Sequence, residues 1–409
     1  MTASDAEQVG LQRRLTLPLL TFYGLGTIVG AGIYVLIGAV AGRAGIYAPI
    51  AFLMSALIAA LTAHSYAALS ARFPKSAGEA VYVREGLGSP LLAGMTGIAV
   101  IVTGVVSAAT IANGFAGYLG VFVDYPSAPV IVVFVVVLCA VAIWGILESV
   151  LMATVITVLS LVGLLIAVYL ASDSLSQLDG DWSKLVPPPE LGAWTGITFG
   201  AFLAFYAFIG FEDMVNVAEE VQNPKQTLPV AIYLALILAA LLYVLVALVA
   251  VLTLDVEVLA RSEAPLVDVV AAAGSRDAAP LIGVLSLLSV TNSALAQIIM
   301  ASRILYGMSR DGALPAWFAS VSPRTKTPTR ATLFTGAVVL LFALALPLVT
   351  LAEITSFIIL AVFTLVNAAY FRLRLRADAG RRIVVTPLVA IALCLFLLVV
   401  QGSVRLIAG

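Results

Sequence analysis

The sequence predicts an all-α integral membrane protein, and three observations carry this prediction. Of the 409 residues, 62% are hydrophobic and 11% are charged, and the mean hydropathy is +1.13. A soluble domain has about 45–50% apolar and about 25% charged residues, so this chain has too few charges to cover a surface in water. Apolar runs long enough to cross a bilayer recur along the chain, and none shows the alternation of a barrel strand.

The charges and cysteines exclude other classes of protein. Lys and Arg total 21 against 22 Asp and Glu, so we expect no basic face and no nucleic-acid partner. Cys139 and Cys394 both lie in apolar runs, and their spacing suits neither a disulfide framework nor a metal site. The polar segment 1–14 lacks the short apolar region and cleavage site of a signal peptide, so none is expected.

Eleven apolar runs predict about eleven membrane-spanning helices, because a helix needs about 20 residues to cross about 30 Å of hydrocarbon. The whole chain, 1–409, is then a single transmembrane domain. The runs, called spans 1 to 11 in order, are 17–40, 47–71, 91–119, 128–147, 150–171, 193–217, 229–254, 280–307, 332–350, 353–371 and 383–404.

The distribution of Lys and Arg predicts the orientation of the spans, because cytoplasmic loops collect positive charge. With segment 1–16 in the cytoplasm, sixteen of the 21 cations fall on the inner side and five on the outer side. We therefore expect a cytoplasmic N-terminus and a location in the cytoplasmic membrane. Of the longer outer segments, we expect 172–192 to be an extended loop and 255–279 to be helical.

Span 1 is rich in glycine. Gly24, Gly26, Gly30 and Gly32 crowd its middle, where each glycine costs about 0.8–1 kcal/mol relative to alanine in a helix. One explanation is close helix packing, because Gly26 and Gly30 form a GxxxG pair. The other is an unwound segment at 30–32, which is tolerated at membrane depth only where it is buried in protein or lines a wet cavity.

Span 6 has the same anomaly at the corresponding place. Gly210 lies near its middle, and Glu212 follows two residues later. A carboxylate inside the membrane is costly and indicates a functional site by default, although a side chain at a helix end can instead extend to water. Because several residues still separate Glu212 from the charged pair at 219–220, we favour a structural or coupling role.

The two interrupted helices are five spans apart, and an odd number of spans reverses the direction in which the chain crosses the membrane. This predicts a 5+5 inverted repeat, formed by 17–171 and 193–371, with 383–404 as an additional helix. A pair of glycine-interrupted spans at matching positions points to the binding site of a transporter. Free N–H groups of a half-helix hold an anion, and free carbonyls hold a cation. A zwitterion with both groups on one carbon, an α-amino acid, satisfies both ends.

Four strings then carry a resemblance to a known family. They are GLGTIVGAGIYVL in span 1, ARFPKSAGEAVYVREGLG after span 2, FIGFEDMVNVAEEVQNPKQTLPVAI from span 6 onward, and NSALAQIIMASRILYGMSRDGALP from span 8 onward. From Leu17 to Arg382 the chain resembles the amino acid–polyamine–organocation (APC) superfamily of transporters. The last string is similar to the cationic amino acid transporter branch and its bacterial relatives. The resemblance implies a LeuT-type fold, with broken helices 1 and 6 and alternating access to a central site.

The resemblance also implies which backbone groups bind the substrate. The carboxylate is expected to bind the N–H groups of Gly30, Ala31 and Gly32. The α-ammonium is expected to meet the carbonyls of Ile28, Tyr206 and Ile209.

Side chains complete the implied site. Tyr206 and Phe208 are expected beside the substrate side chain as aromatic gates, and Glu212 corresponds to the span-6 glutamate of the family. Gln297 of span 8 matches a family position that lines the substrate side chain. Ser107 of span 3 forms a further wall or instead bonds a neighbouring helix. The hydroxyls of Ser286, Ser289 and Ser293 share one face of span 8, which we expect to turn toward span 1.

The chain departs from the family in span 5. Many proton-linked relatives have a lysine there in place of a sodium ion, whereas this chain has Ser160. Either Na⁺ binds near Ser160, Ser289 and span-1 carbonyls, or coupling is absent and the protein exchanges or facilitates. His64, the one histidine, either relays a proton or bonds a neighbouring backbone group. With eleven expected spans, we expect no counterpart of the family's usual twelfth span, which lies outside the ten-helix core.

We therefore expect a permease for α-amino acids, with a neutral side chain favoured because Glu212 is the one evident acid of the pocket. A polyamine or other organocation carrier and a non-coupled exchanger stay open as alternatives. An intramembrane enzyme is disfavoured by the lack of paired histidines or aspartates, and a channel by the lack of a continuous polar lining. No cofactor or metal is expected beyond a coupling Na⁺ or H⁺. The expected partners are the amino acid and the lipid bilayer, and a homo-oligomer stays open.

Overall fold

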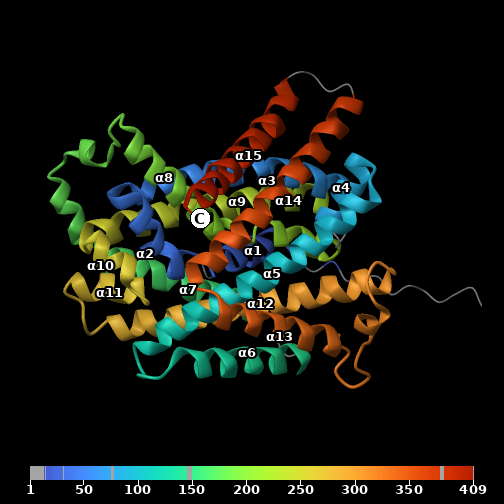
Figure 1. Ribbon diagram of the computed structural model, residues 1–409, viewed down its shortest axis with the longest axis horizontal. Helices are drawn as coiled ribbons and strands as arrows, with labels where there is room; N and C mark the ends of the chain where they lie inside the picture. Colours follow the sequence, from blue (N-terminus) through green and yellow to red (C-terminus); the bar gives the residue numbers. More distant parts are fainter. Residues whose placement is uncertain are drawn as a thin grey trace, which may run out of the picture.

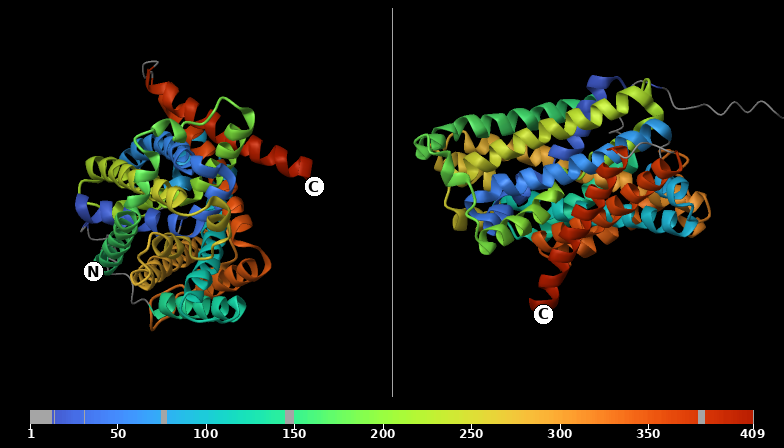
Figure 2. Two further views of the ribbon diagram at one scale, coloured as in Figure 1. Left: turned by 90° about the vertical axis from the view of Figure 1, so that its left-hand side faces the viewer. Right: turned by 90° about the horizontal axis from the view of Figure 1, so that it is seen from above.

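The computed structural model describes residues 13, 15–30, 32–74, 78–144, 150–377 and 382–408. Their long helices run roughly side by side, and α15 crosses the others at an angle (Figures 1 and 2). The α-helices are α1 (Leu17–Val29), α2 (Gly32–Ala44), α3 (Ala48–Arg72), α4 (Gly78–Leu87), α5 (Pro90–Gly120), α6 (Ser127–Trp144), α7 (Val150–Leu170), α8 (Leu191–Ala204), α9 (Pro224–Thr253), α10 (Val256–Arg261), α11 (Pro265–Ala272), α12 (Ala279–Arg310), α13 (Thr329–Ala345), α14 (Leu348–Arg376) and α15 (Arg382–Ala408). The 3₁₀ helices are η1 (Gly45–Tyr47), η2 (Ser172–Leu178), η3 (Trp182–Leu185), η4 (Phe205–Phe208), η5 (Glu212–Glu220) and η6 (Ala316–Ala319).

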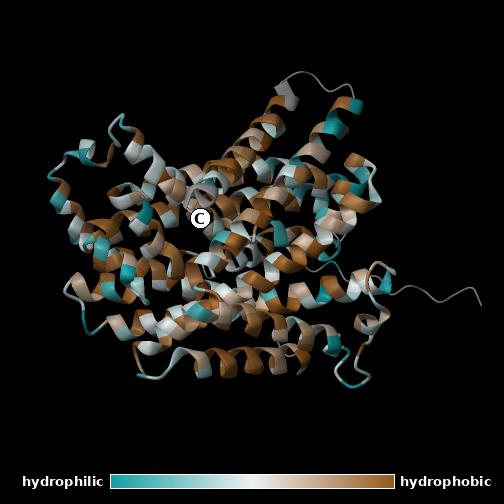
Figure 3. Cartoon of the chain, in the orientation of Figure 1, coloured by the Kyte–Doolittle hydropathy of each residue, from teal (hydrophilic) through white to brown (hydrophobic). Residues whose placement is uncertain are grey.

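The apolar runs of the sequence coincide with helices. Nine helical segments of the described chain are long and apolar enough to cross a membrane, and Leu17–Val29 and Thr329–Ala345 are shorter apolar helices. One of the nine, Gly32–Arg72, contains the second half of span 1 together with span 2. Hydrophobic residues dominate the helices, and hydrophilic residues gather toward the two ends of the bundle (Figure 3). The predicted all-α membrane protein is confirmed.

Both predicted helix breaks are present. In span 1, α1 ends at Val29, Gly30 follows as its C-cap, and α2 begins at Gly32. In span 6, α8 runs into η4, the chain turns at Gly210 with a φ of +124°, and η5 follows. The inverted-repeat relation between 17–171 and 193–371 stays a prediction.

The breaks lie in the core of the bundle. α3 packs along α9, α5 packs along α12, and α1 contacts both α9 and α7. The second half of span 1, α2, packs against α8, the first half of span 6. Large aromatic side chains fill the space around the breaks, and Tyr66, Phe208, Phe211, Tyr243 and Phe363 are fully buried.

One end of span 6 is tied to the N-terminal segment and to α4. The Leu15 N–H donates to the Glu220 carbonyl at 3.0 Å, and the Gln222 N–H donates to the Leu15 carbonyl at 2.9 Å. α4 packs between α5 and α14. Its first residue, Gly78, lies directly against Val215 of η5.

The structure corrects one of the two expectations for the outer segments. Segment 172–192 is not an extended loop, because η2 and η3 occupy most of it. The Asp181 side chain accepts from the Ser183 N–H at 3.1 Å and so caps the start of η3. Segment 255–279 is helical as predicted, since it contains α10 and α11.

Candidate functional site

The two helix breaks touch each other. The Thr27 hydroxyl donates to the Gly210 carbonyl at 2.9 Å. A Cβ added at Gly210 would lie 2.6 Å from the Thr27 carbonyl carbon, and one at Gly32 would overlap the Ala207 backbone. Both glycines are therefore required for the backbones of spans 1 and 6 to approach this closely.

A tyrosine of span 7 bridges the two breaks. The Tyr243 hydroxyl lies 2.8 Å from the Ile28 carbonyl and 3.0 Å from the Ala207 carbonyl. Its ring meets the Phe208 ring edge to face, with the centroids 5.2 Å apart. The Ile28 carbonyl, which we expected to receive the substrate ammonium, thus already accepts a hydroxyl. Sequence reasoning missed Tyr243, although it interrupts an otherwise aliphatic run.

Span 8 supplies hydroxyls to the break in span 1. The Ser289 hydroxyl donates to the Gly30 carbonyl at 3.1 Å. A Cβ added at Gly30 would overlap the Ser293 hydroxyl, which is buried and has no hydrogen-bond partner. The expected orientation of this serine face is confirmed for Ser289 and Ser293. Ala31 lies outside the described residues.

The expected aromatic and span-3 residues lie around the break in span 6. Ser107 and Tyr206 are buried, and their hydroxyls are 2.9 Å apart. The Ile209 N–H donates to the Tyr206 carbonyl at 3.2 Å. The structure therefore brings span 3 against the break, while the carbonyl of Tyr206 already has a partner.

Two buried carboxylates follow the break in span 6. Glu212 accepts from the Gly210 N–H at 2.8 Å, so it caps a backbone donor that the turn would otherwise leave unpaired. The neighbouring carboxylate, Asp213, accepts from the Gln297 amide at 3.3 Å. Gln297 is expected to line the substrate side chain, so its contact brings Asp213 to the same region. The sequence had predicted one acid there, Glu212, and not Asp213.

Ser160, one of the expected cation-binding residues, contacts span 1 through another tyrosine. The Tyr34 hydroxyl donates to the Ser160 carbonyl at 2.7 Å, while the Ser160 hydroxyl donates to the Ile156 carbonyl of its own helix at 2.9 Å. The span-5 hydroxyl that lies directly against span 1 is that of Thr157, which a Cβ at Gly26 would overlap. Across the described part of the chain, no cluster of three His, Cys, Asp or Glu side chains has the geometry to hold a metal ion.

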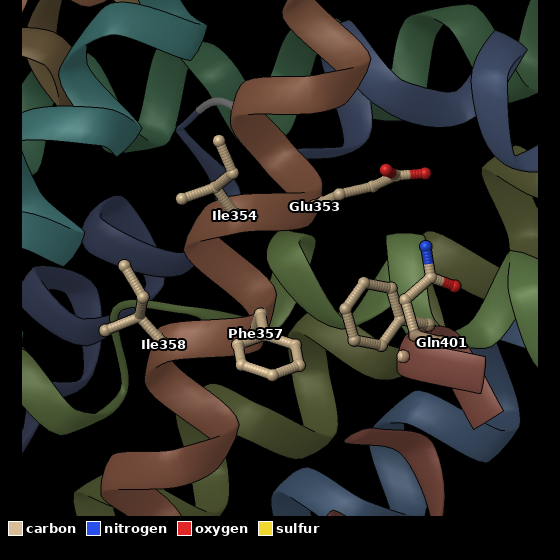
Figure 4. Close-up of a pocket in the computed structure, with 7 residues that line it drawn as sticks. Glu353, Ile354, Phe357, Ile358 and Gln401 are labelled. Carbon is tan, nitrogen blue, oxygen red and sulfur yellow. The ribbon is translucent and has the colours of Figure 1, made fainter. Parts of the chain in front are cut away.

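A peripheral cavity of about 270 Å³ lies away from the breaks, between α8, α14 and α15. Phe202, Glu353, Phe357 and Gln401 are among its lining residues, and the carboxylate of Glu353 and the amide of Gln401 lie on the same side of it (Figure 4). None of the residues expected from the sequence to bind the substrate lines this cavity. The single histidine, His64, bonds the Tyr233 hydroxyl at 2.9 Å, and its ring packs edge to face on Tyr370.

Comparison with known proteins is consistent with this architecture. An uncharacterized transporter of Mycobacterium tuberculosis (strain ATCC 25618 / H37Rv) is 34% identical over 390 residues, which cover 95% of this chain and 86% of that protein. The branched-chain amino acid permease BcaP of Bacillus subtilis is 29% identical over 434 residues, covering 100% of this chain and 92% of the permease. The mitochondrial cationic amino acid transporter 3 of Arabidopsis thaliana is 32% identical over 384 residues, covering 87% of this chain and 61% of its own length.

The family pattern for amino acid permeases matches residues 20–408. This match covers nearly the whole chain, and the relatives are named as transporters rather than enzymes. The resemblance expected from the four strings is therefore confirmed, and the chain belongs to the amino acid permease family.

Proposed function

We propose that this protein is a secondary transporter that moves α-amino acids across the cytoplasmic membrane by alternating access. The observation that carries the proposal is the contact between two interrupted helices in the core, at Gly32 and Ala207 and at Thr27 and Gly210. Irregular backbone at membrane depth occurs where it is buried in protein or lines a cavity. A pair of such breaks supplies both N–H and carbonyl groups to one ligand.

We infer different roles for the end of α1 and the start of α2, which flank the first break. The carbonyls at the end of α1 already accept hydroxyls, Ile28 from Tyr243 and Gly30 from Ser289. The first N–H groups of α2 have no partners within the helix, because a helix leaves its first four donors unpaired. An anion is therefore the group that gains most at the start of α2, and the substrate carboxylate fits this end.

The orientation and the coupling ion follow from weaker signals and are part of the proposal. The excess of cations in alternate loops favours a cytoplasmic N-terminus. The Thr157 hydroxyl lies against Gly26, and the Ser289 hydroxyl donates to the Gly30 carbonyl, so oxygen ligands suitable for Na⁺ are present at the first break. A proton is the other candidate for the coupling ion.

The carboxylate-binding role is tested with Gly32→Val in proteoliposomes. We expect amino acid counterflow to be lost, because the added side chain overlaps the Ala207 backbone and covers the start of α2. Gly94→Ala is the matched control, since a Cβ there meets nothing within 4 Å. Size-exclusion profiles of both variants report folding, and Gly32→Ala is the milder variant if Gly32→Val does not fold.

Competition by other molecules distinguishes the alternatives. An α-amino acid should inhibit counterflow, whereas its decarboxylated amine should not, because the amine leaves the α2 N–H groups without a partner. Equal inhibition by the amine would favour an organocation carrier. Unchanged counterflow in a folded Gly32→Val would contradict the site.

A further inference from the structure

A second group of polar residues extends from the break in span 6 to the place where α4 meets η5. Glu79, in the first turn of α4, is only 3% exposed, whereas the nearby Arg72 faces water. Arg84 and Glu85, on the same helix as Glu79, are also exposed and 3.8 Å apart. No sequence pattern distinguishes Glu79 from these exposed charges. Its burial therefore needs a physical explanation.

Glu79 is surrounded by acids and phenols. The Tyr66 hydroxyl of α3 lies 3.4 Å from the Glu79 carboxylate, and the Tyr66 ring packs edge to face on Tyr82 and on Phe211. The first turn of α4 lies against η5, since a Cβ at Gly78 would be 3.3 Å from the Asn216 side-chain oxygen. Glu79 is close enough to Glu212 and Asp213 for their charges to interact.

The three carboxylates have too few polar partners. No Lys or Arg of the described chain forms an ion pair with any of them. Two buried polar groups at the cluster are unpartnered, the Tyr82 hydroxyl and the side-chain oxygen of Gln297, whose amide nitrogen already contacts Asp213. The spacing of the three carboxylates does not suit a metal ion. A buried acid of this kind loses its charge by binding a proton, because an unpaired charge in a low-dielectric interior is costly.

Other titratable groups approach the cluster from the neighbouring helices. Tyr23 of α1 interacts electrostatically with Asp213, and also with Arg303 and Glu220. From α14, Arg372 bonds the Leu87 carbonyl at the far end of α4 and so does not neutralise Glu79. Burial raises the pKa of Glu79 from 4.5 to about 7, with the Asp213 charge adding to the rise and hydrogen bonds from its backbone and Tyr66 opposing it.

We propose that Glu79, Glu212 and Asp213 form a shared proton-binding site, whose occupancy holds η5 against α4 at one end of the broken span 6. The proposal rests on the transport function above, because it assigns the coupling proton of that cycle. With the proton bound, the three acids tolerate close packing. Without it, their repulsion pushes η5 away from the first turn of α4, and the break at Gly210 is where the chain can turn.

The first test compares Glu79→Gln with Glu85→Gln, its exposed counterpart on the same helix, in the full-length protein. Infrared difference spectra are recorded across pH values on either side of about 7. We expect a carboxylic acid C=O band that disappears as the pH rises in the wild type and in Glu85→Gln. The band should be absent or shifted in Glu79→Gln. An identical titration in all three proteins would overturn the proposal.

The second test uses transport and separates this proposal from the proposed function. Counterflow at equal pH on both sides reports substrate translocation alone, and accumulation driven by a pH gradient reports coupling. We expect Glu79→Gln to keep counterflow but to lose most of its response to the gradient, while Glu85→Gln keeps both. A wild type that shows counterflow and ignores the gradient overturns the proton site and leaves the transporter intact. Absence of counterflow contradicts the transporter, while the infrared titration still decides the proton site.

Discussion

The two helix breaks differ in what makes glycine necessary. Gly30 has a φ of −64° and a ψ of −36°, an ordinary right-handed conformation that any residue adopts. What excludes a side chain there is the Ser293 hydroxyl of a neighbouring helix. Gly210 has a φ of +124°, which L-residues rarely adopt, and it also lies against the Thr27 backbone. Glycine is thus required at the first break by a neighbouring side chain, whereas at the second break the backbone conformation itself already requires it.

The chain also continues differently after each break. Span 1 resumes as the α-helix α2, whereas span 6 continues as η5, a nine-residue 3₁₀ helix with acidic residues in its first turn. 3₁₀ helices longer than 3–4 residues are uncommon and often mark a hinge or strain. From this contrast we expect that span 1 stays fixed during transport and that span 6 changes shape. Substitutions at the two breaks should therefore have different consequences.

The largest effect is expected for Gly210→Ala. An alanine there must adopt a strained backbone, at a cost of about 1–3 kcal/mol, and must also displace the Thr27 carbonyl. We expect a lower melting temperature in detergent and loss of counterflow. Gly180→Ala is the control that has backbone strain without a close contact, because Gly180 has a φ of +75° but open space around it. If Gly210→Ala is no worse than Gly180→Ala, the contact between the breaks does not matter.

A smaller and reversible effect is expected for Gly30→Ala. Its added methyl group overlaps mainly the Ser293 side chain, with the Gly26 carbonyl oxygen at 3.0 Å, so Ser293→Gly should restore most of the space and the Ser289 bond to the Gly30 carbonyl. Residues in contact show interaction energies of about 0.5–3 kcal/mol in double-mutant cycles. We expect the double variant to recover most of the melting temperature and counterflow that Gly30→Ala loses. Additive losses would show that Gly30 is required for another reason.

The sequence predicted the breaks because glycines and Glu212 stand out against an apolar background. It could not predict what satisfies the exposed backbone, because the partners come from distant helices. Tyr243 lies 215 residues from Ile28, and no local pattern connects the two. Glu79 was likewise indistinguishable from solvated loop charges, since its burial depends on how α4 packs against η5 and α14. Ser160 and Thr157 are a further example. Alignment with the family identifies span 5, but it does not show which of the two hydroxyls faces the first break.

The smallest effect is expected for Tyr243→Phe, which affects both breaks at once. The variant keeps the ring that packs on Phe208 and removes the hydroxyl shared by the Ile28 and Ala207 carbonyls. Leaving a buried acceptor unpaired costs about 1–3 kcal/mol, so a modest fall in melting temperature is expected. Tyr118→Phe is the matched control, because its hydroxyl donates at 2.7 Å to the Tyr34 carbonyl within α2 rather than to the Ile28 and Ala207 carbonyls.

The two phenylalanine variants should lose similar stability but differ in transport. Only Tyr243→Phe frees carbonyls that the substrate ammonium can reach, so only this variant should change KM, while the limiting rate of counterflow stays close to that of the wild type. If the ammonium takes the place of the Tyr243 hydroxyl during binding, KM falls, because the substrate no longer has to displace a hydrogen bond. Equal KM values in both variants and the wild type would show that the ammonium does not bind the Ile28 and Ala207 carbonyls. The breaks would then bind the substrate through its carboxylate alone.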